Sequence, residues 1–477
     1  MKLLRHAAAI AAVCSASVAI AQAPAAPTGP GAVPIGPVGT RPTDTPLYLA
    51  SASASERAVA IYSGLWSGNQ SMELLESDIL FPTTSTRTDV DHANKTVAVT
   101  YAEEMPPRIA VWRKVLGCAQ LPAGATLEDA KYLPQVAADL QTPNFDDQPW
   151  PLGDANASAE LPSAQAAALN AIIEAAFDGS TYGGKTWAVL VVKDGKIVGE
   201  RYAGGFGIHV GHQTHSAAKS FAATLIGIAT MKDGLDITRA PALQEWSRPG
   251  DPRGKINVEH LLHMASGLYA EGGGSPQADI YFQGGTVAEL AATNVLHTLP
   301  GTRFFYNPPD TMLAMRALRQ AVSDDARFLA YPFQELYWKL GMTRTVTMSD
   351  WNGDYLMSGQ TYSTARDFAR FGLLYLADGV WNGERILPEG WAQYVATPAP
   401  AQPGGNSAGY GAQFWLYGGR EGLPADTYGP SGGLGQWAMI IPSQNMVVVR
   451  RGLDGIPGFR IERFTADVLA AVSGLPR

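Results

Sequence analysis

Hydrophobic residues recur with a helical period in one part of the chain and in strand-like runs in others. Residues 169–177 place apolar side chains at i, i+3, i+4, i+7 and i+8, which predicts an amphipathic helix. Residues 187–192 and 196–202 predict two strands, and the Asp194-Gly195 pair between them is typical of a hairpin turn. We therefore expect a helix followed by a β-hairpin.

A second pair of strands is expected near the C-terminus. Residues 436–441 and 446–450 are apolar runs separated by a turn-forming segment, and a final helix follows with one apolar side. Residues 235–409, between the two pairs of strands, have mostly helical patterns with long loops. Strands at both ends and helices between them predict an α/β (α+β) fold, in which helices flank one antiparallel β-sheet and a helical domain is inserted.

This pattern defines one large domain over residues 161–477. A globular N-terminal extension precedes it at residues 48–160 and includes a strand-like alternation at 96–101. The role of this extension is open, because a lid, a stabilising cover and a partner surface all fit. Within the large domain, the expected parts are an α/β lobe at residues 161–234 and 410–477, and a helical lobe at residues 235–409.

The N-terminus has the parts of a secretory signal peptide at residues 1–21. Lys2 and Arg5 give it a positive start, an apolar stretch follows, and Ala19-Ile20-Ala21 is a small-x-small cleavage site. A linker rich in proline and glycine comes next, at residues 22–47. We therefore expect a periplasmic or secreted protein with a cleavable signal peptide.

Charge, cysteine and histidine content limit the possible partners. The chain has 35 Lys and Arg against 43 Asp and Glu and no evident basic patch, so nucleic acid is not expected as a partner. After the signal peptide, no apolar stretch reaches the roughly 18 residues of a membrane span. Cys118 is the one cysteine left, so no internal disulfide can form. His212 and His215 form a close pair without a third ligand at suitable spacing, so no metal is expected.

Residues 214–232 combine a serine and a lysine with an otherwise apolar helix. No charged residue separates Lys219 from Lys232, which predicts a helix that is buried nearly all round and ends at Gly234. Ser216 would lie at the helix N-terminus, where free N–H groups and the helix dipole favour a developing oxyanion. Lys219 would share its face, and loss of hydration would lower the pKa of Lys219 so that a neutral amine can take the serine proton.

The Ser-x-x-Lys spacing alone is weak evidence, because it occurs by chance about once or twice in a chain of this length. The alternative interpretation makes Ser216 an N-cap residue and Lys219 a surface lysine of the first turn. That alternative predicts polar neighbours, and residues 217–231 provide few of them. The pattern favours an activated serine–lysine pair without excluding the alternative.

Several segments, in a shared order, resemble the serine hydrolases related to class C β-lactamases and penicillin-binding proteins. The most similar branch is that of the 6-aminohexanoate-dimer hydrolases and esterases. This resemblance implies a β-lactamase/transpeptidase-like fold from about residue 161 to the C-terminus. The segments that carry it are residues 199–203, 216–220, 261–268, 300–306, 365–374 and 432–436.

The resemblance also implies two further elements of a site. Tyr306 would meet Ser216 and Lys219 through its hydroxyl or phenolate and pass a proton to the leaving group. The segment 430–433 would form a strand opposite the serine and supply a second oxyanion-hole N–H beside that of Ser216. Gly433 is the expected donor, to within a residue or two.

Two positions depart from the penicillin-recognising branch of these enzymes. That branch begins the strand motif with Lys or His, which helps to hold a substrate carboxylate, whereas Pro430 and Ser431 here are uncharged. It also has Asn two places after the tyrosine, where this chain has Pro308. Both departures favour simpler esters or amides over β-lactams as substrates.

The sequence therefore predicts an exported serine hydrolase that cleaves an ester or amide bond through an acyl-enzyme, without a metal or an organic cofactor. The expected partner is a small-molecule ester or amide, and the oligomeric state is open. The alternative among enzymes is a β-lactamase or D-alanyl-D-alanine carboxypeptidase, and the alternative of another class is a non-catalytic binding or sensing protein. Residues 270–285 should line the cleft, where Tyr281 and Phe282 either contact substrate or pack.

Overall fold

Strands from two distant parts of the chain form one antiparallel sheet. The computed structural model describes residues 45–79, 87–270, 275–455 and 457–473. The sheet has eight strands in the order β12-β13-β14-β16-β17-β5-β6, with β15 paired to β16, so the expected fold class is confirmed. Its strands are β5 (Lys185–Lys193), β6 (Lys196–Tyr202), β12 (Gly409–Tyr410), β13 (Trp415–Leu416), β14 (Tyr428–Gly429), β15 (Ser431–Gly432), β16 (Gln436–Ile441) and β17 (Met446–Leu453).

The hairpin of β5 and β6 follows from its turn residues. Asp194 and Gly195 have φ angles of +49° and +79°, the left-handed values that a tight two-residue hairpin turn requires. The pairing of Lys193 with Lys196 closes the turn, as the sequence predicts. Strand β17 pairs with β5 on its other side, so the N-terminal hairpin and the C-terminal strands share one set of hydrogen bonds.

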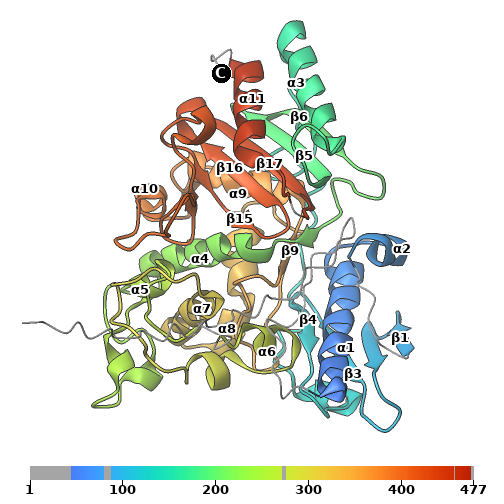
Figure 1. The fold of residues 1–477 in the computed structure, drawn as a ribbon, viewed down its shortest axis with the longest axis vertical. Coiled ribbons are helices and arrows are strands. Elements are labelled where there is room, and N and C mark those ends of the chain that lie inside the picture. The colour runs from blue at the N-terminus through green and yellow to red at the C-terminus, as the bar shows by residue number, and fades with distance from the viewer. Residues whose placement is uncertain (1–44, 80–86, 271–274, 456, 474–477) are drawn as a thin grey trace, which may run out of the picture.

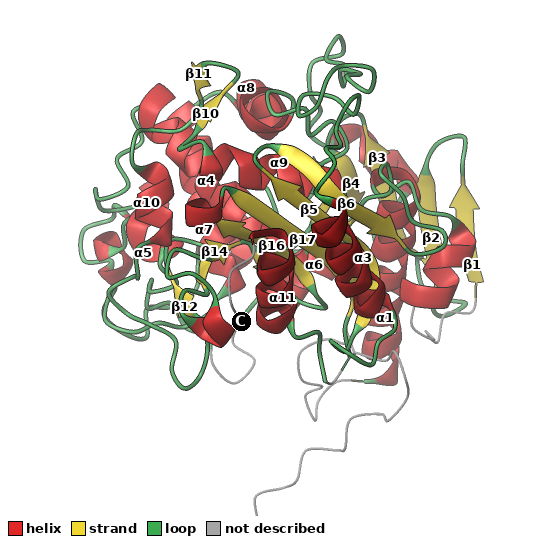
Figure 2. Ribbon diagram, turned by 90° about the horizontal axis from the view of Figure 1, so that it is seen from above, coloured by secondary structure: helices red, strands yellow, loops and turns green. Residues whose placement is uncertain are grey.

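Helices cover both faces of this sheet. Helices α3 (Ser163–Phe177) and α11 (Ile461–Ser473) lie side by side over one face, as Figure 2 shows, and pack against Val189 and Val191 of β5. Helix α9 (Ala365–Leu376) packs on the opposite face, against β5, β16 and β17. Helix α9 thus belongs to the sheet layers, although its residues lie within the range that the sequence pattern assigns to the helical lobe.

Helix α4 (Ala218–Lys232) separates the sheet from a group of helices beneath it (Figure 1). Its residues from Ala218 to Ala229 are buried, as expected for a helix that is apolar nearly all round. Gly234 follows with a φ of +67°, the left-handed conformation that commonly ends a helix. The helices around it are α5 (Val258–Leu262), α6 (Gln277–Phe282), α7 (Pro308–Val322), α8 (Asp325–Tyr331) and α10 (Trp391–Ala396).

Short strands complete the region below the main sheet. One small sheet has the order β7-β9-β8, and a separate two-stranded hairpin is formed by β10 and β11. The small sheet matters for the site because β7 leads directly into α4. The strands are β7 (His212–Gln213), β8 (Val346–Thr347), β9 (Thr361–Ser363), β10 (Val380–Trp381) and β11 (Glu384–Arg385).

The N-terminal region forms a four-stranded antiparallel sheet covered by one helix. Helix α1 (Pro46–Tyr62) packs on β2, β3 and β4, and Val97 and Val99 of β2 are buried in the core between them. The predicted signal peptide and most of the linker lie outside the described residues. Among those that are described, no helix combines the length and apolar character that crossing a bilayer requires. The remaining elements are α2 (Met72–Leu74), β1 (Arg87–Asp91), β2 (Thr96–Thr100), β3 (Arg108–Arg113) and β4 (Gly117–Gln120).

The tight packing of α4 gives a test of the fold. A methyl group added at Gly227 would lie 2.6 Å from Cε2 of Trp391, which is closer than packed atoms allow. We expect Gly227→Ala to lower the free energy of unfolding by about 1–2 kcal/mol, because overpacking outweighs the better helix propensity of alanine. Urea unfolding measures this change. Gly204→Ala is the matched control, since its methyl group meets nothing within 4 Å and should change stability by less than about 0.5 kcal/mol.

Candidate active site

Ser216 lies in the short turn that joins β7 to α4. The turn His215–Ala217 is a single 3₁₀ turn, and the Ser216 side chain is half-buried, so solvent and ligands reach it. His215 has a φ of +46°, an uncommon value for a residue with a side chain, which stores about 1–3 kcal/mol of strain. Thr214 N donates to Thr361 O at 2.7 Å and ties the turn to β9. The nucleophile candidate thus sits on a sharp, externally fixed turn.

Lys219 reaches back from the first turn of α4 to Ser216. Its Nζ lies 3.1 Å from Ser216 Oγ and donates to Ser358 O at 2.5 Å. The lysine side chain is buried, with 1% of its surface exposed. Because the carbonyl of Ser358 accepts one N–H, a neutral amine can turn its lone pair toward the serine hydroxyl. The structure therefore excludes the surface-lysine interpretation.

The electrostatics at Lys219 favour the neutral amine. Loss of hydration on burial lowers the pKa of Lys219 to about 7, although the nearby carboxyl of Asp310 acts in the opposite direction. Burial raises the pKa of Asp310 to about 7, while hydrogen bonds from Ser266 and Asn307 favour its ionised form. The charges of the buried lysine and aspartate thus favour each other's ionised form, while burial of each group favours the neutral form.

Asp310 is a site residue that sequence reasoning missed. It lies in the first turn of α7, directly after Pro308-Pro309, and is fully buried. Its position in sequence resembles an ordinary acidic residue at a helix N-terminus, which the helix dipole favours. The only indication in the sequence is that Asp310 is the single acidic residue at the start of an otherwise apolar helical turn. That pattern does not predict a contact with Lys219, which lies 91 positions earlier.

Tyr306 lies in the loop before α7, where its hydroxyl is near enough to the Ser216 side chain for that group to lower the pKa of Tyr306 in part. Lys219 Nζ is 4.9 Å from the centre of its ring, and the ring packs against those of Tyr410 and Trp415. Burial raises the pKa of Tyr306 well above its usual value, so the side chain is a phenol and not a phenolate. The structure thus brings together the three residues that the sequence and the resemblance selected.

Strand β15 lies beside the nucleophile turn. A Cβ added at Gly432 would lie 2.1 Å from Thr214 O and 3.1 Å from Ala217 N, so only glycine permits this approach. Gly433 is exposed, and a Cβ added there would lie 4.0 Å from His215 Cβ. The backbone of β15 therefore lies against the turn that carries Ser216, and Gly433, the residue after β15, stays the predicted second oxyanion donor.

The other charged groups near the turn are already paired or neutral. Loss of hydration, together with the nearby charges of Arg451 and Lys219, lowers the pKa of His215 to about 4. The guanidinium of Arg451 is fully buried and donates to Gln436 Oε1, Ser363 O and His212 O. Arg451 therefore supplies a fixed positive field without being available to a ligand.

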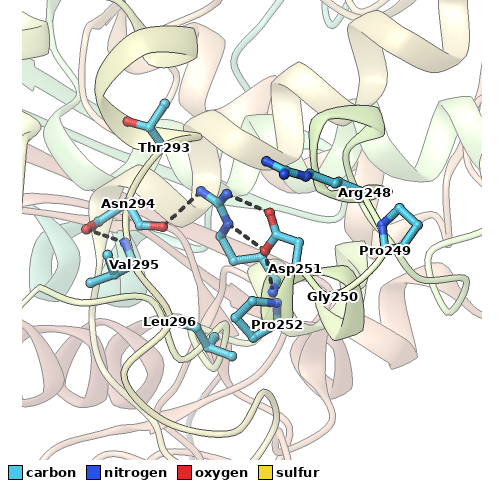
Figure 3. A pocket seen from close by; sticks show the side chains of 10 residues that line it. Arg248, Pro249, Gly250, Asp251, Pro252, Thr293, Asn294, Val295 and Leu296 are labelled. Carbon is cyan, nitrogen blue, oxygen red and sulfur yellow. Dashed lines mark hydrogen bonds and ion pairs between the residues drawn. The ribbon is translucent and has the colours of Figure 1, made fainter.

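One surface cavity lies away from this site. It has a volume of about 490 Å³ and is lined by residues 248–253 and 293–296 (Figure 3). Within it Arg253 is held by Asp251 and by the carbonyl of Asn294, so its guanidinium is paired. None of the candidate catalytic residues lines this cavity, and it supplies no chemistry to the serine.

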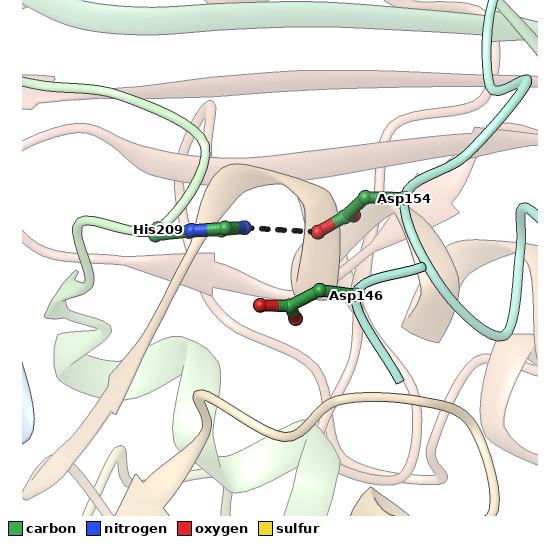
Figure 4. Close-up of side chains that lie close together, drawn as sticks. All are labelled: Asp146, Asp154 and His209. Atoms are coloured by element: carbon green, nitrogen blue, oxygen red, sulfur yellow. Dashed lines mark hydrogen bonds and ion pairs between the residues drawn. The ribbon is translucent and has the colours of Figure 1, made fainter. Parts of the chain in front are cut away.

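A second cluster resembles a metal site in composition. Asp146, Asp154 and His209 bring their ligand atoms within 4.8 Å of one another (Figure 4). Arginines already occupy both carboxylates: Arg344 binds Asp146 through two hydrogen bonds, and Arg370 binds Asp154 at 2.8 Å. The cluster is therefore an ion-pair network that holds this loop to α9.

The histidine pair noted in the sequence does not form a metal site within the described part of the chain. His212 is buried between the rings of Trp187 and Phe206, and burial keeps its pKa far below the ordinary value. His215 is the first residue of the 3₁₀ turn that carries Ser216. Among the described residues, neither histidine belongs to a group of three side chains that could bind a metal together.

Comparison with known proteins identifies the family and the fold to which this chain is similar. The Beta-lactamase family matches residues 169–450. A putative 6-aminohexanoate-dimer hydrolase from Bacillus anthracis has a TM-score of 0.53 at 21% identity, over 73% of this chain and 90% of its own. A putative β-lactamase from Bacteroides dorei DSM 17855 has a TM-score of 0.53 at 22% identity, over 64% and 98%. For a family VIII carboxylesterase the TM-score is 0.53 at 14% identity, over 66% and 98%. No curated protein matches the chain by sequence.

The antiparallel sheet with helices on both faces defines the class, a serine hydrolase fold of the β-lactamase type. Because the family match spans more than half of the sequence, the chain belongs to the Beta-lactamase family of serine hydrolases. The family resemblance read from the sequence segments is thereby confirmed. At these identities the solved structures show the fold, and the chemistry must be argued from the site itself.

The buried lysine predicts the pH dependence of catalysis. If the neutral amine accepts the proton, kcat/KM for an ester should rise with pH through about 7, the pKa of Lys219. In Asp310→Asn the acid limb should move to lower pH, because removing the carboxylate removes the charge that favours the ammonium form. A pH–rate profile of both proteins checks this. A limb that stays in place or moves to higher pH would contradict the coupling.

The close approach of β15 gives a matched pair of glycine variants. If the segment after β15 supplies an oxyanion donor, Gly432→Ala should lower kcat about a hundredfold or more, because its methyl group displaces that backbone from the Ser216 turn. Gly433→Ala keeps its N–H and meets no atom closer than 4.0 Å, so it should stay within a few-fold of the parent. Steady-state ester hydrolysis compares them, and equal effects at the two positions would argue against this placement of the strand.

Proposed function

We propose that this chain is an exported hydrolase that cleaves an ester or amide bond through an acyl-enzyme on Ser216. Lys219 is the activating base, and Tyr306 carries the proton to the leaving group. The observation that supports this most strongly is the position of the Lys219 amine, 3.1 Å from Ser216 Oγ and fixed by Ser358 O on its other side. A lysine held there serves proton transfer better than packing, because burying an amine opposes stability.

The first half of the reaction forms the acyl-enzyme. The neutral amine of Lys219 accepts the Ser216 proton while Oγ bonds to the substrate carbonyl carbon. The N–H groups of Ser216 and Gly433 hold the negative oxygen of the tetrahedral intermediate. The proton then passes from Lys219 through the Tyr306 hydroxyl to the leaving alcohol or amine as the scissile bond breaks.

The second half returns the enzyme to its starting state. Water gives a proton to Lys219, directly or through Tyr306, as its oxygen bonds to the acyl carbon. The bond to Ser216 Oγ breaks, Oγ regains the proton, and the carboxylic acid leaves. Each proton taken in the first half is thus restored, and the cycle needs no metal or organic cofactor.

Charge near the serine bears on the substrate class. Strand β15 begins at the uncharged Ser431, directly after Pro430, and the donors of the nearby Arg451 are taken by protein oxygens. A substrate carboxylate in this position would lack a partner for its charge, and a buried unpaired charge is strongly unfavourable. We therefore infer an uncharged acyl or leaving group next to the scissile bond, as in simple esters and amides.

Export is part of the proposal and rests on the sequence alone. The positive start, apolar stretch and small-x-small site of residues 1–21 are those of a cleavable signal peptide. The periplasm or the exterior is then the compartment in which this hydrolase meets its substrate.

Replacement of the nucleophile tests the proposed function. Ser216→Ala should lower kcat for a short-chain ester about a thousandfold or more, because the covalent route is lost. A fluorophosphonate probe should add its mass to the parent protein at Ser216 and leave the variant unlabelled. If Ser216→Ala hydrolyses the ester nearly as fast as the parent protein, Ser216 is not the nucleophile.

Ser220→Ala provides the matched control on the same helix. Ser220 is buried one turn further on and donates to Gln413 O at 2.7 Å, so its loss affects packing and leaves the proton path intact. Activity per folded molecule should therefore stay within a few-fold of the parent. Nitrocefin and a panel of esters and amides, tested with the same proteins, then separate a β-lactamase from the proposed esterase or amidase.

A further inference from the structure

The N-terminal region contacts the chain on two sides of the Ser216–Lys219 pair. Gln70 Nε2 donates to Gly211 O at 2.7 Å, immediately before β7 and the nucleophile turn. Ser63 Oγ, at the end of α1, donates to Met348 Sδ at 3.4 Å, in the segment that leads to Ser358. The N-terminal region therefore contacts the segment that leads to Ser216 and the segment that leads to Ser358, whose carbonyl accepts a hydrogen bond from Lys219.

A third contact joins α1 to the short helix α6, which Figure 1 shows beside it. Ser55 Oγ donates to Phe282 O, the last carbonyl of α6. Ser55 is fully buried, and Phe282 packs against both the core of the N-terminal region and the main core. A Cβ added at Gly284, just beyond α6, would lie 2.6 Å from Pro122 Cα of the N-terminal region. Helix α6 is thus fixed against this region at its C-terminal end.

Helix α6 in turn carries a tyrosine to the site. The hydroxyl of Tyr281 and Ser358 Oγ are joined by a short hydrogen bond, and both residues are buried. A Cβ added at Gly359 would lie 2.8 Å from the same hydroxyl, so the tyrosine lies directly against the 358–359 backbone. The carbonyl of Ser358 is the acceptor for Lys219 Nζ.

We propose that the N-terminal region positions the candidate base: Ser55 fixes α6, and Tyr281 on α6 fixes Ser358, whose carbonyl orients the Lys219 amine. Tyr281 and Ser55 are positioning residues in this arrangement, acting through Ser358. The proposal rests on the function proposed above, in which Lys219 takes the serine proton.

Physical reasons make this support necessary. Helix α6 has six residues, and a helix of that length is not stable by its own hydrogen bonds. Its last carbonyls also lack partners within the helix, and Ser55 supplies one of them. The Beta-lactamase match begins at residue 169, so the supporting helix α1 lies before the matched region. Of the three roles that the sequence leaves open for this region, namely a lid, a stabilising cover and a partner surface, these contacts favour the stabilising cover.

Two substitutions interrupt the chain of contacts at different points. In Tyr281→Phe, Ser358 loses its partner, and we expect kcat to fall between about tenfold and a hundredfold while KM changes less than about twofold. The acid limb of the pH profile should also move to lower pH, because a carbonyl that drifts from Lys219 no longer favours the ammonium form. Ser55→Ala should change the same two quantities in the same direction, by smaller factors.

The double variant tests whether the two residues act in one path. If Ser55 acts through Tyr281, the Ser55→Ala, Tyr281→Phe protein should lose little more activity than Tyr281→Phe alone, in place of the product of the two losses. The matched controls are Ser53→Ala, at a half-buried serine of the same helix, and Tyr331→Phe, whose hydroxyl donates to Asp233 beyond the far end of α4. Both controls should keep the kcat and the pH profile of the parent.

The outcomes separate this proposal from the function on which it rests. A rise of KM alone in Tyr281→Phe would make Tyr281 a substrate contact and overturn the positioning role. Multiplicative losses in the double variant, or an acid limb that does not move, would overturn it as well. Retained turnover in Ser216→Ala would instead contradict the proposed function itself. Because that test uses a different variant, the two failures can be told apart.

Discussion

The burial of the Lys219 amine is the constraint on which the rest of the site depends. A charged ammonium loses most of its hydration at this depth, and the neutral form is favoured until a partner compensates. Two groups compensate in part: the carbonyl of Ser358 accepts a hydrogen bond, and the carboxyl of Asp310 lies close enough to oppose the shift. The balance leaves the amine able to gain and lose a proton near pH 7, which is what a base must do.

The fold supplies the apolar surroundings that this balance needs. Helix α4 is buried between the main sheet and the lower helices, so the Lys219 side chain is almost wholly covered, and its amine lies beside the half-buried Ser216. The strained φ of His215 fixes Ser216 at the mouth of this buried helix, and Gly432 lets β15 approach the same turn. Sheet, helix and turn thus meet at one serine, and at Gly432 the approach of the sheet requires glycine.

Local patterns predicted the elements of this fold, and distant contacts decided the rest of the site. The hairpin was foreseeable because Asp194-Gly195 specifies its own turn, and α4 because its apolar run and Gly234 are continuous in sequence. Ser216 and Lys219 share one helical turn, so their pairing was also predictable. Tyr306 came from the family resemblance alone. Ser358 was beyond reach because it meets Lys219 across 139 positions, and no periodicity reports such a contact.

The protonation states of the buried ionisable groups around Ser216 are compatible with the proposed reaction. Burial favours the neutral forms of the ionisable groups closest to the serine, which are Tyr306, His215, Lys219 and Asp310. In the proposed reaction the oxyanion is the main charge created, in surroundings of low dielectric constant where the α4 N-terminus and the Gly433 amide would act strongly. The positive field of the buried Arg451 is present before the reaction and needs no rearrangement. In the proposed mechanism such a site would stabilise the transition state more than the neutral substrate, and that difference is what accelerates a hydrolysis.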